Sequence, residues 1–211
     1  KLLWKLRGGP TGRKILGNGR LISTWPVRGA PVLYQGVIYF TAGIWPFMGT
    51  FIHAVDAQTG QILWTNSGSG SDYQMQPHGS PAFAGVAPQG YLTATEKILL
   101  VPGGRSVPAA YDRKSGDFLY YHIDKFSKRF GGYRVAASQE WFANGGTLFR
   151  LSDGHELANI SPSIISGNTM IGLSDSKLTG YATTPIARRV TKKDRIGREK
   201  VHTKYHFKQL W

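Results

Sequence analysis

The chain has 211 residues, of which 41% are hydrophobic, so it is long enough to bury one large core or two small ones. It contains no cysteine, which excludes disulfides, thiolate metal sites and cysteine nucleophiles. No segment approaches the roughly 18 consecutive apolar residues of a transmembrane helix. The net charge of +14 lies at the two ends, because residues 1–55 hold seven basic and no acidic residues, and residues 188–211 hold nine basic and two acidic.

The chain begins at Lys1, with neither an initiator methionine nor a signal peptide. The stretch LLWKLRGG near this end is similar to a terminal strand of the units described next, and so is the closing HFKQLW. We therefore expect a fragment or a trimmed chain.

Four short strands are predicted in the first unit, at residues 30–34, 36–42, 50–56 and 61–66. The last two are joined by a turn over residues 57–60. Asp56 is placed to accept backbone N–H bonds across this turn, and Gly60 supplies a positive φ at little steric cost.

The frame around this turn, AVDAQTGQILW (54–64), recurs along the chain. AYDRKSGDFLY (110–120) matches it closely, FRLSDGHELANI (149–160) matches more weakly with Asp153-Gly154 as its turn, and SDSKLTGYA (174–182) keeps only Thr179-Gly180. Segments 28–43 and 78–94 also share an [R/H]-G-[A/S]-P opening. These repeats predict four-stranded units.

The spacing of the repeats indicates an all-β fold, a β-propeller of four-stranded antiparallel blades, about four of them visible. Gly60 and Gly116 are 56 residues apart and Gly116 and Gly154 are 38 apart, which brackets the roughly 40–50 residues of a blade. A β-sandwich with chance similarity is the alternative. The expected units are residues 1–10 (the end of a preceding blade), 21–67, 78–123, 131–160 and 161–211.

The basic C-terminal segment is predicted to be a hairpin that turns near residues 194–197. Val201, Tyr205 and Phe207 alternate with basic residues, so one face of the strand is expected to be buried and the other basic. A solvated charged face is one interpretation. An anionic membrane or protein surface is another, and nucleic acid is disfavoured because no binding motif is present.

Loops between the second and third strands, and between blades, are expected to emerge on one face of the propeller. The candidate binding residues on these loops are Arg28, Trp45, Phe47, Gln76, His78, Arg105 and Arg134. The basic members suit an anionic ligand, although each could instead cap loop carbonyls or pair with Asp72 or Asp112. Residues 44–48 are too apolar for a solvated hairpin, so they either line a pocket, hold a partner or fold over the blade itself.

The frame with Asp56, Gly60 and Trp64 resembles the tryptophan-docking repeat of the pyrroloquinoline-quinone (PQQ) type. That repeat is found in quinoprotein dehydrogenases and in the PQQ-like propeller of the outer-membrane assembly lipoproteins. The resemblance covers most of residues 1–185 and is strongest in the first two units. It implies that Trp4, Trp64 and Trp211, with Tyr120 as a substitute, dock each blade on its neighbour.

The resemblance also implies a periplasmic or cell-envelope location and a propeller of seven or eight blades, so the chain is expected to need further blades or chains to close. PQQ with Ca²⁺ is possible by resemblance only, because the adjacent cysteine pair that stacks on PQQ in the family is absent. No metal site and no catalytic residue is assigned. The favoured function is a non-catalytic binding or assembly scaffold with a protein partner or a small anionic ligand; the alternative is part of a PQQ-dependent oxidoreductase whose catalytic residues lie elsewhere.

Overall fold

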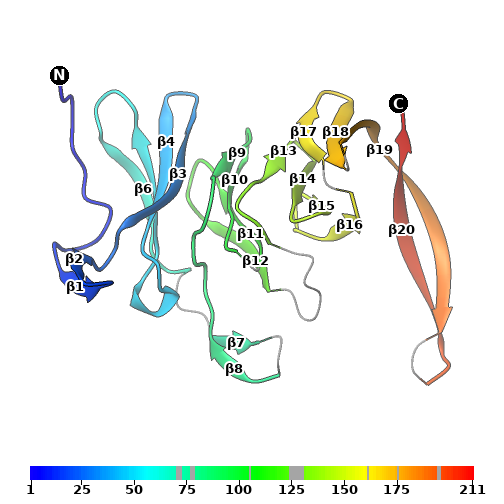
Figure 1. Cartoon of the computed structure of the whole chain (residues 1–211), viewed down its shortest axis with the longest axis horizontal. Helices are drawn as coiled ribbons and strands as arrows, with labels where there is room; N and C mark the ends of the chain where they lie inside the picture. The colour runs from blue at the N-terminus through cyan, green and yellow to red at the C-terminus, as the bar shows by residue number, and fades with distance from the viewer. Residues whose placement is uncertain are drawn as a thin grey trace. The chain divides into compact units, whose positions relative to one another are not determined.

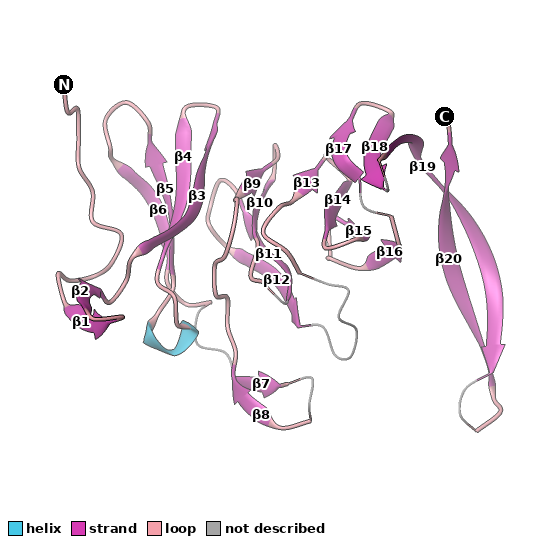
Figure 2. Ribbon diagram, viewed as in Figure 1, coloured by secondary structure: helices cyan, strands magenta, loops and turns pink. Residues whose placement is uncertain are grey.

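The structure is a computed structural model that describes residues 1–69, 73–76, 79–104, 106–123, 131–160, 162–174, 176–193 and 196–211 (Figure 1). These residues form two compact units, Lys1–Val135 and Ala136–Trp211. Within these described residues, nearly all of the regular structure is antiparallel β-sheet, and there is one short 3₁₀ turn, η1 (Pro46–Met48) (Figure 2).

The first unit contains two four-stranded sheets and two small hairpins. The first sheet has the order β3 (Val27–Tyr34), β4 (Val37–Ala42), β5 (Phe51–Asp56) and β6 (Ile62–Asn66). The second has the order β9 (Thr93–Ala94), β10 (Ile98–Val101), β11 (Ser106–Asp112) and β12 (Phe118–Ile123). The hairpins are β1 (Lys14–Gly17) with β2 (Arg20–Ser23), and β7 (Tyr73–Met75) with β8 (Pro81–Phe83).

The second unit contains two further four-stranded sheets with the same sequential order. The third sheet consists of β13 (Ala136–Ala137), β14 (Trp141–Asn144), β15 (Thr147–Arg150) and β16 (Glu156–Ala158). The fourth consists of β17 (Pro162–Ser166), β18 (Thr169–Ser174), β19 (Lys177–Lys193) and β20 (Glu199–Gln209).

Each sheet is thus a meander in which sequence neighbours pair antiparallel, which is how a propeller blade is built. The all-β prediction is confirmed, and the open sheets fit a partial propeller. The predicted strands of the first sheet agree with the observed ones to within about three residues at each end.

The core of the first unit lies between its two sheets. Tyr39, Ile52 and Ala54 from the first sheet pack with Leu99 and Tyr111 from the second, and all five are buried. Because successive side chains of a strand point to opposite faces, His53 lies on the other face of the first sheet, and the N-terminal segment packs there. A smaller core in the second unit joins Ala143, Leu148 and Met170 of the third and fourth sheets.

Three tight turns share one hydrogen-bonding pattern, which confirms the first three copies of the repeat. The amides of Gly60, Gly116 and Gly154 each donate to the carbonyl four residues earlier, at 2.9 Å in every case. Asp56 Oδ1 accepts from the Thr59 amide (2.7 Å) and hydroxyl (2.7 Å), and these bonds lower the pKa of Asp56 below its usual value.

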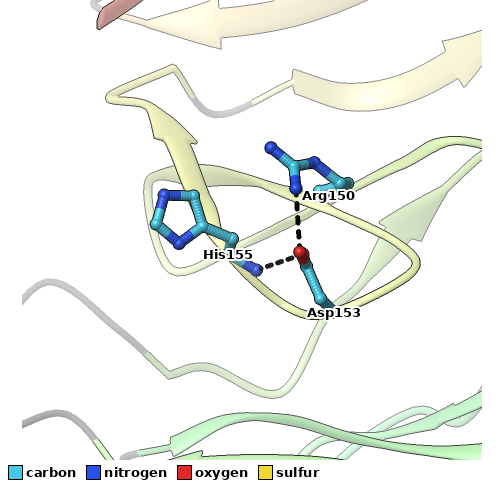
Figure 3. Close-up of polar contacts among 3 residues, drawn as sticks. All are labelled: Arg150, Asp153 and His155. Carbon is cyan, nitrogen blue, oxygen red and sulfur yellow. Dashed lines mark hydrogen bonds and ion pairs between the residues drawn. The ribbon is translucent and has the colours of Figure 1, made fainter. Parts of the chain in front are cut away.

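The third turn reverses the roles of its side chains. Arg150 stands where the other copies have aspartate, and its Nη1 atom lies 2.8 Å from Oδ2 of Asp153 (Figure 3). Asp153 Oδ1 also accepts from the His155 amide at 2.9 Å. The backbone geometry is therefore kept while the donor and acceptor side chains exchange positions.

Three expectations need correction. The second sheet begins at Thr93, not near residue 78, because residues 73–83 form the separate β7–β8 hairpin. Thr179-Gly180 lies inside β19, so the fourth trace of the repeat is not a turn of the same kind. Val201 is exposed, because β19 and β20 extend beyond β17 and β18, whereas Tyr205 and Phe207 are partly buried as predicted.

Candidate functional site

The loops of the first unit gather at the end of its sheets opposite the Asp56–Gly60 turn; we call this the loop end. Val27 pairs with Ala42, and Ile52 pairs with Asn66, so the start of β3, the β4–β5 loop and the exit of β6 share this end. Ala30 forms a parallel bridge with Tyr91, just before β9, so the innermost segments of both sheets run in the same direction. The loop ends of the two sheets therefore lie on the same side.

The apolar loop at residues 43–50 is held in a defined shape. The indole Nε1 of Trp25 donates to the Met48 carbonyl at 2.8 Å, and the Gly43 amide donates to the Pro26 carbonyl at 3.0 Å. A Cβ at Gly43 would lie 2.5 Å from the Gly49 carbonyl oxygen, so the two sides of the loop meet at their backbones. Phe47 is nevertheless 62% exposed. The loop presents this ring to solvent and does not fold it over the blade.

The β7–β8 hairpin adds more exposed apolar side chains to the loop end. The Val86 amide donates to the Ser69 carbonyl (3.1 Å), and the Val86 carbonyl accepts from the Thr50 hydroxyl (2.9 Å), so the base of the hairpin is fastened to the β4–β5 loop. Tyr73 and Phe83 meet edge to face with ring centroids 5.1 Å apart. Gln76 lies in the hairpin turn, where its amide donates to the Ser80 carbonyl.

A chain of backbone hydrogen bonds links the innermost segments. The Ala30 amide donates to the Gly90 carbonyl (2.9 Å), and the Tyr91 amide donates to the Tyr133 carbonyl (2.8 Å). A Cβ at Gly90 would lie only 2.4 Å from the Tyr133 carbonyl oxygen, so this close approach requires glycine. Arg134 follows directly, and its guanidinium lies 5.3 Å from the centre of the Tyr133 ring.

Exposed aromatic and methionine side chains therefore gather at the loop end. We call the following set the aromatic patch: Trp45, Phe47, Tyr73, Met75, Phe83, Tyr91 and Tyr133. Of the candidates from sequence, Trp45 and Phe47 belong to it, and Gln76 lies in the adjoining turn. Arg28 and Arg134 lie on the linked inner segments. His78 and Arg105, and also Asp72, lie outside the described residues.

The tryptophan contacts between neighbouring segments are repeated. Nε1 of Trp64 donates to the Arg113 carbonyl at 3.1 Å, and Nε1 of Trp4 donates to the Ala57 carbonyl at 3.1 Å. Each indole covers the glycine of the turn it reaches. A Cβ at Gly116 would lie 2.5 Å from the Trp64 ring, and one at Gly60 would lie 2.7 Å from the Trp4 ring.

The other two docking candidates have different surroundings. Trp211 lies against Gly180 of its own sheet, and the two residues are joined by a 3.1 Å backbone hydrogen bond. Tyr120 is buried and stacks on His122 of its own strand, with ring centroids 5.5 Å apart.

Arg113 is a buried residue that sequence reasoning missed. Only 6% exposed, it donates from Nη1 to the Tyr39 hydroxyl (2.9 Å), from Nη2 to Gln35 Oε1 (3.0 Å) and from Nε to the Glu96 carbonyl (2.9 Å). Its guanidinium also lies 4.7 Å from the centre of the Tyr34 ring. One difference between the first two copies of the repeat points to this residue: Arg113 occupies the position that Ala57 has in the first copy. Arg113 joins the two sheets of the first unit.

His53 is a second buried group, and it fastens the N-terminal segment. Its Nε2 lies 2.8 Å from the Gly8 carbonyl oxygen, which can only accept, so Nε2 carries the proton. Nδ1 then accepts from the Thr65 hydroxyl at 2.9 Å. Burial among Phe40 and Phe51 lowers the pKa of His53 below 6.5.

The described residues do not fit a PQQ and Ca²⁺ site. No group of three or more His, Asp or Glu side chains is placed to hold a metal ion within the described ranges. Asp56 and Asp112 are occupied by their own turns, where each accepts backbone amides. The chain has no cysteine pair to stack on a quinone.

A shallow groove of about 420 Å³ lies in the second unit. Its walls come from β16 with the residues that follow it, and from β20. Glu156 stands on one side, and Lys204 and His206 on the other.

Similarity to known proteins is found among solved structures. No protein-family model and no curated protein matches the sequence. The chain is similar to a quinohemoprotein alcohol dehydrogenase from Comamonas testosteroni (18% identity, TM-score 0.42, covering 64% of this chain and 21% of that one). It is also similar to BamB from Moraxella catarrhalis (12% identity, TM-score 0.45, covering 83% of this chain and 52% of that one). A third similar structure is the computationally designed Ika4 protein (13% identity, TM-score 0.41, covering 85% of this chain and 91% of that one).

The chain spans about a fifth of the matched dehydrogenase and about half of BamB. Among the described residues, no helix has the length and apolar character needed to cross a membrane.

Proposed function

We propose that this chain is a non-catalytic binding scaffold that contacts a protein partner through the aromatic patch. The observation that carries the proposal is the concentration of exposed aromatic and methionine side chains at one end of the first unit. Among the exposed aromatic and methionine side chains described in that unit, Phe118 alone lies at the opposite end, which carries the Asp56–Gly60 and Asp112–Gly116 turns and which we call the turn end. Single scattered apolar residues need no explanation, whereas exposed aromatic side chains gathered at one end of a unit favour an interaction surface there.

The composition of the patch favours a protein over a small molecule. Aromatic residues, methionine and arginine are the types enriched in protein interfaces. Phe47 projects from a loop whose backbone is fixed by Trp25, so little conformational entropy is lost when a partner covers it. Arg28 and Arg134 on the linked inner segments would then contact acidic or carbonyl groups of the protein partner and not a small anionic ligand.

A photo-cross-linking experiment tests this function. We would replace Phe47 with p-benzoylphenylalanine and irradiate the folded protein with a cell-envelope extract of the producing organism. A matched probe at Phe118, 45% exposed at the turn end of the second sheet, is the control. The proposal expects a discrete adduct from position 47 that is absent from position 118. Equal labelling from both positions, or none from position 47, would contradict it.

The alternative function is part of a PQQ-dependent oxidoreductase located in the cell envelope, with its catalytic residues in further blades. It is tested separately by adding PQQ and Ca²⁺ to the full-length protein. Cofactor absorbance together with dye reduction by alcohols or sugars would favour the oxidoreductase and argue against the scaffold.

A further inference from the structure

The fourth sheet continues into a two-stranded ribbon, formed by residues 186–193 of β19 and 199–206 of β20. Figure 1 shows it extending beyond β17 and β18 of the same unit. Val190 and Tyr205 are the only partly buried side chains among these sixteen positions; the other fourteen are exposed. An isolated two-stranded ribbon is marginally stable in water, and this one has almost no core of its own.

The register of the ribbon places like charges directly opposite each other. Arg188 pairs with Lys204, and Lys192 pairs with Lys200. Directly opposed residues on one face have Cβ atoms about 5 Å apart, and like charges in directly opposed positions destabilise the pairing. Glu199 is the only acidic residue in the two strands, and it faces Lys193 on the other side of the ribbon. The pairing of Arg188 with Lys204 therefore costs stability in the free protein.

All the residues on one face of the ribbon are either cationic, histidine or aliphatic. This basic face consists of Ile186, Arg188, Val190, Lys192, Lys200, His202, Lys204 and His206. It contains no Asn, Gln, Ser or Thr, while the opposite face has Thr191, Thr203 and Tyr205. Only the base of the basic face, at Lys204 and His206, borders the groove that contains Glu156.

We propose that the basic face binds the surface of an anionic phospholipid bilayer. Lipid phosphates would lie among the opposed cations and remove their mutual repulsion. Exposed Ile186 fits the same surface, because lysine and arginine stems lie along apolar material while their charged ends reach the phosphates. Ile196 in the ribbon turn is 71% exposed and extends the aliphatic contact.

The same chemistry disfavours nucleic acid as the occupant. A two-stranded ribbon fits the major groove, where base edges are read by Asn, Gln, Ser and Thr as well as by arginine and lysine. The basic face offers no amide or hydroxyl side chain. It also lacks the phenylalanine, tyrosine and tryptophan side chains on which single-stranded bases stack. Cations interleaved with aliphatic side chains match a headgroup layer better.

The test uses two matched double variants of the full chain. R188Q/K192Q removes one arginine and one lysine from the basic face, and R189Q/K193Q removes the same pair of residue types from the opposite face of the same strand. Binding is measured by co-sedimentation with vesicles of phosphatidylcholine containing 30% phosphatidylglycerol, and with pure phosphatidylcholine vesicles. Circular dichroism confirms that each variant is folded.

We expect the wild-type chain to bind the anionic vesicles and not the neutral ones, and less tightly as ionic strength rises. Each cation near the surface contributes a factor of about five in affinity, so R188Q/K192Q should bind about 25-fold more weakly. R189Q/K193Q should lose no more than a few-fold. Equal losses in the two variants, or no binding to anionic vesicles, would overturn the proposal.

Two further measurements keep the inference decisive. Tighter binding to duplex DNA or RNA than to anionic vesicles at the same ionic strength, with the same dependence on Arg188 and Lys192, would replace lipid by nucleic acid and refute our assignment. Without lipid, R188Q/K192Q should raise the melting temperature because it removes two like-charge pairs. An unchanged or lower melting temperature would show that the opposed cations do not destabilise the ribbon, and would overturn the proposal.

Discussion

The contact between Trp64 and Gly116 gives the sharpest test of how the two sheets of the first unit are joined. We consider the substitution Gly116→Ala. Gly116 has a φ of +79°, and a Cβ there would lie 2.5 Å from Cε3 of Trp64. Gly36 has nearly the same backbone, with a φ of +78°, but nothing lies within 4 Å of its Cβ position. Gly36→Ala is therefore a matched control without the contact.

The two substitutions share one cost and differ in another. Placing alanine in the left-handed region costs about 1–2 kcal/mol at either position. At Gly116 the Trp64 ring must also retreat by about 1 Å to reach an ordinary carbon–carbon separation of about 3.5–4.0 Å. Overpacking of this kind costs about 1–3 kcal/mol. We expect Gly116→Ala to lower the free energy of unfolding by about 2–5 kcal/mol and Gly36→Ala by about 1–2 kcal/mol.

Urea denaturation followed by far-ultraviolet circular dichroism measures the difference. With a denaturant slope of about 1–3 kcal/mol per molar urea, 2 kcal/mol moves the midpoint by about 1 M. The same pair of substitutions in a Trp64→Ala background completes a double-mutant cycle. If tryptophan docking causes the extra cost, Gly116→Ala and Gly36→Ala become equal in that background. An extra cost that persists without Trp64, or that is absent with it, would refute the reasoning.

Two other predictions follow from buried side chains. Arg113→Met should lower the free energy of unfolding by about 2–4 kcal/mol in the same assay, because it leaves the Tyr39 hydroxyl and the Glu96 carbonyl without their donor. Arg113→Lys should recover less than half of this loss. Full recovery by lysine would contradict the three-donor geometry. Burial lowers the pKa of His53 below 6.5, so the unfolded chain binds this proton more readily than the folded chain. The contribution of His53 to the free energy of unfolding should therefore be fully present above pH 6.5 and should fall as the pH drops from 6.5 towards the pKa of the folded state. A pH series of unfolding free energies should show this slope in the wild-type chain and its loss in His53→Gln, and an unchanged slope in the variant would exclude His53 as its source.

Local features of the fold could be predicted from the sequence because they are encoded within a few residues. The turn at Asp56–Gly60 needs only an acceptor side chain and a residue that tolerates positive φ, and its second copy has the same types. The strands of the first sheet followed from alternation and from the turns that bound them. The apolar loop with Trp45 and Phe47 was also identified from composition, and the structure places both residues at the loop end.

Features that depend on distant partners could not be predicted. The motif around His78 resembles the opening of β3, yet the innermost strand of the second sheet begins at Thr93, because the hydrogen bond between Ala30 and Gly90 selects the segment that pairs beside β3. Arg113 has the sequence environment of an exposed turn residue. It is buried because Gln35 and Tyr39 of the preceding sheet approach it.

Residue types and their periodicity, which the sequence alone provides, determined the turns, the strands and the basic character of the C-terminal segment. Only the tertiary structure decided which residues face each other across β19 and β20. A shift of register by one residue would move every side chain of one strand to the other face. The observed register puts Arg188 opposite Lys204 and Lys192 opposite Lys200, so the electrostatic cost of the ribbon is a property of strand pairing and not of composition.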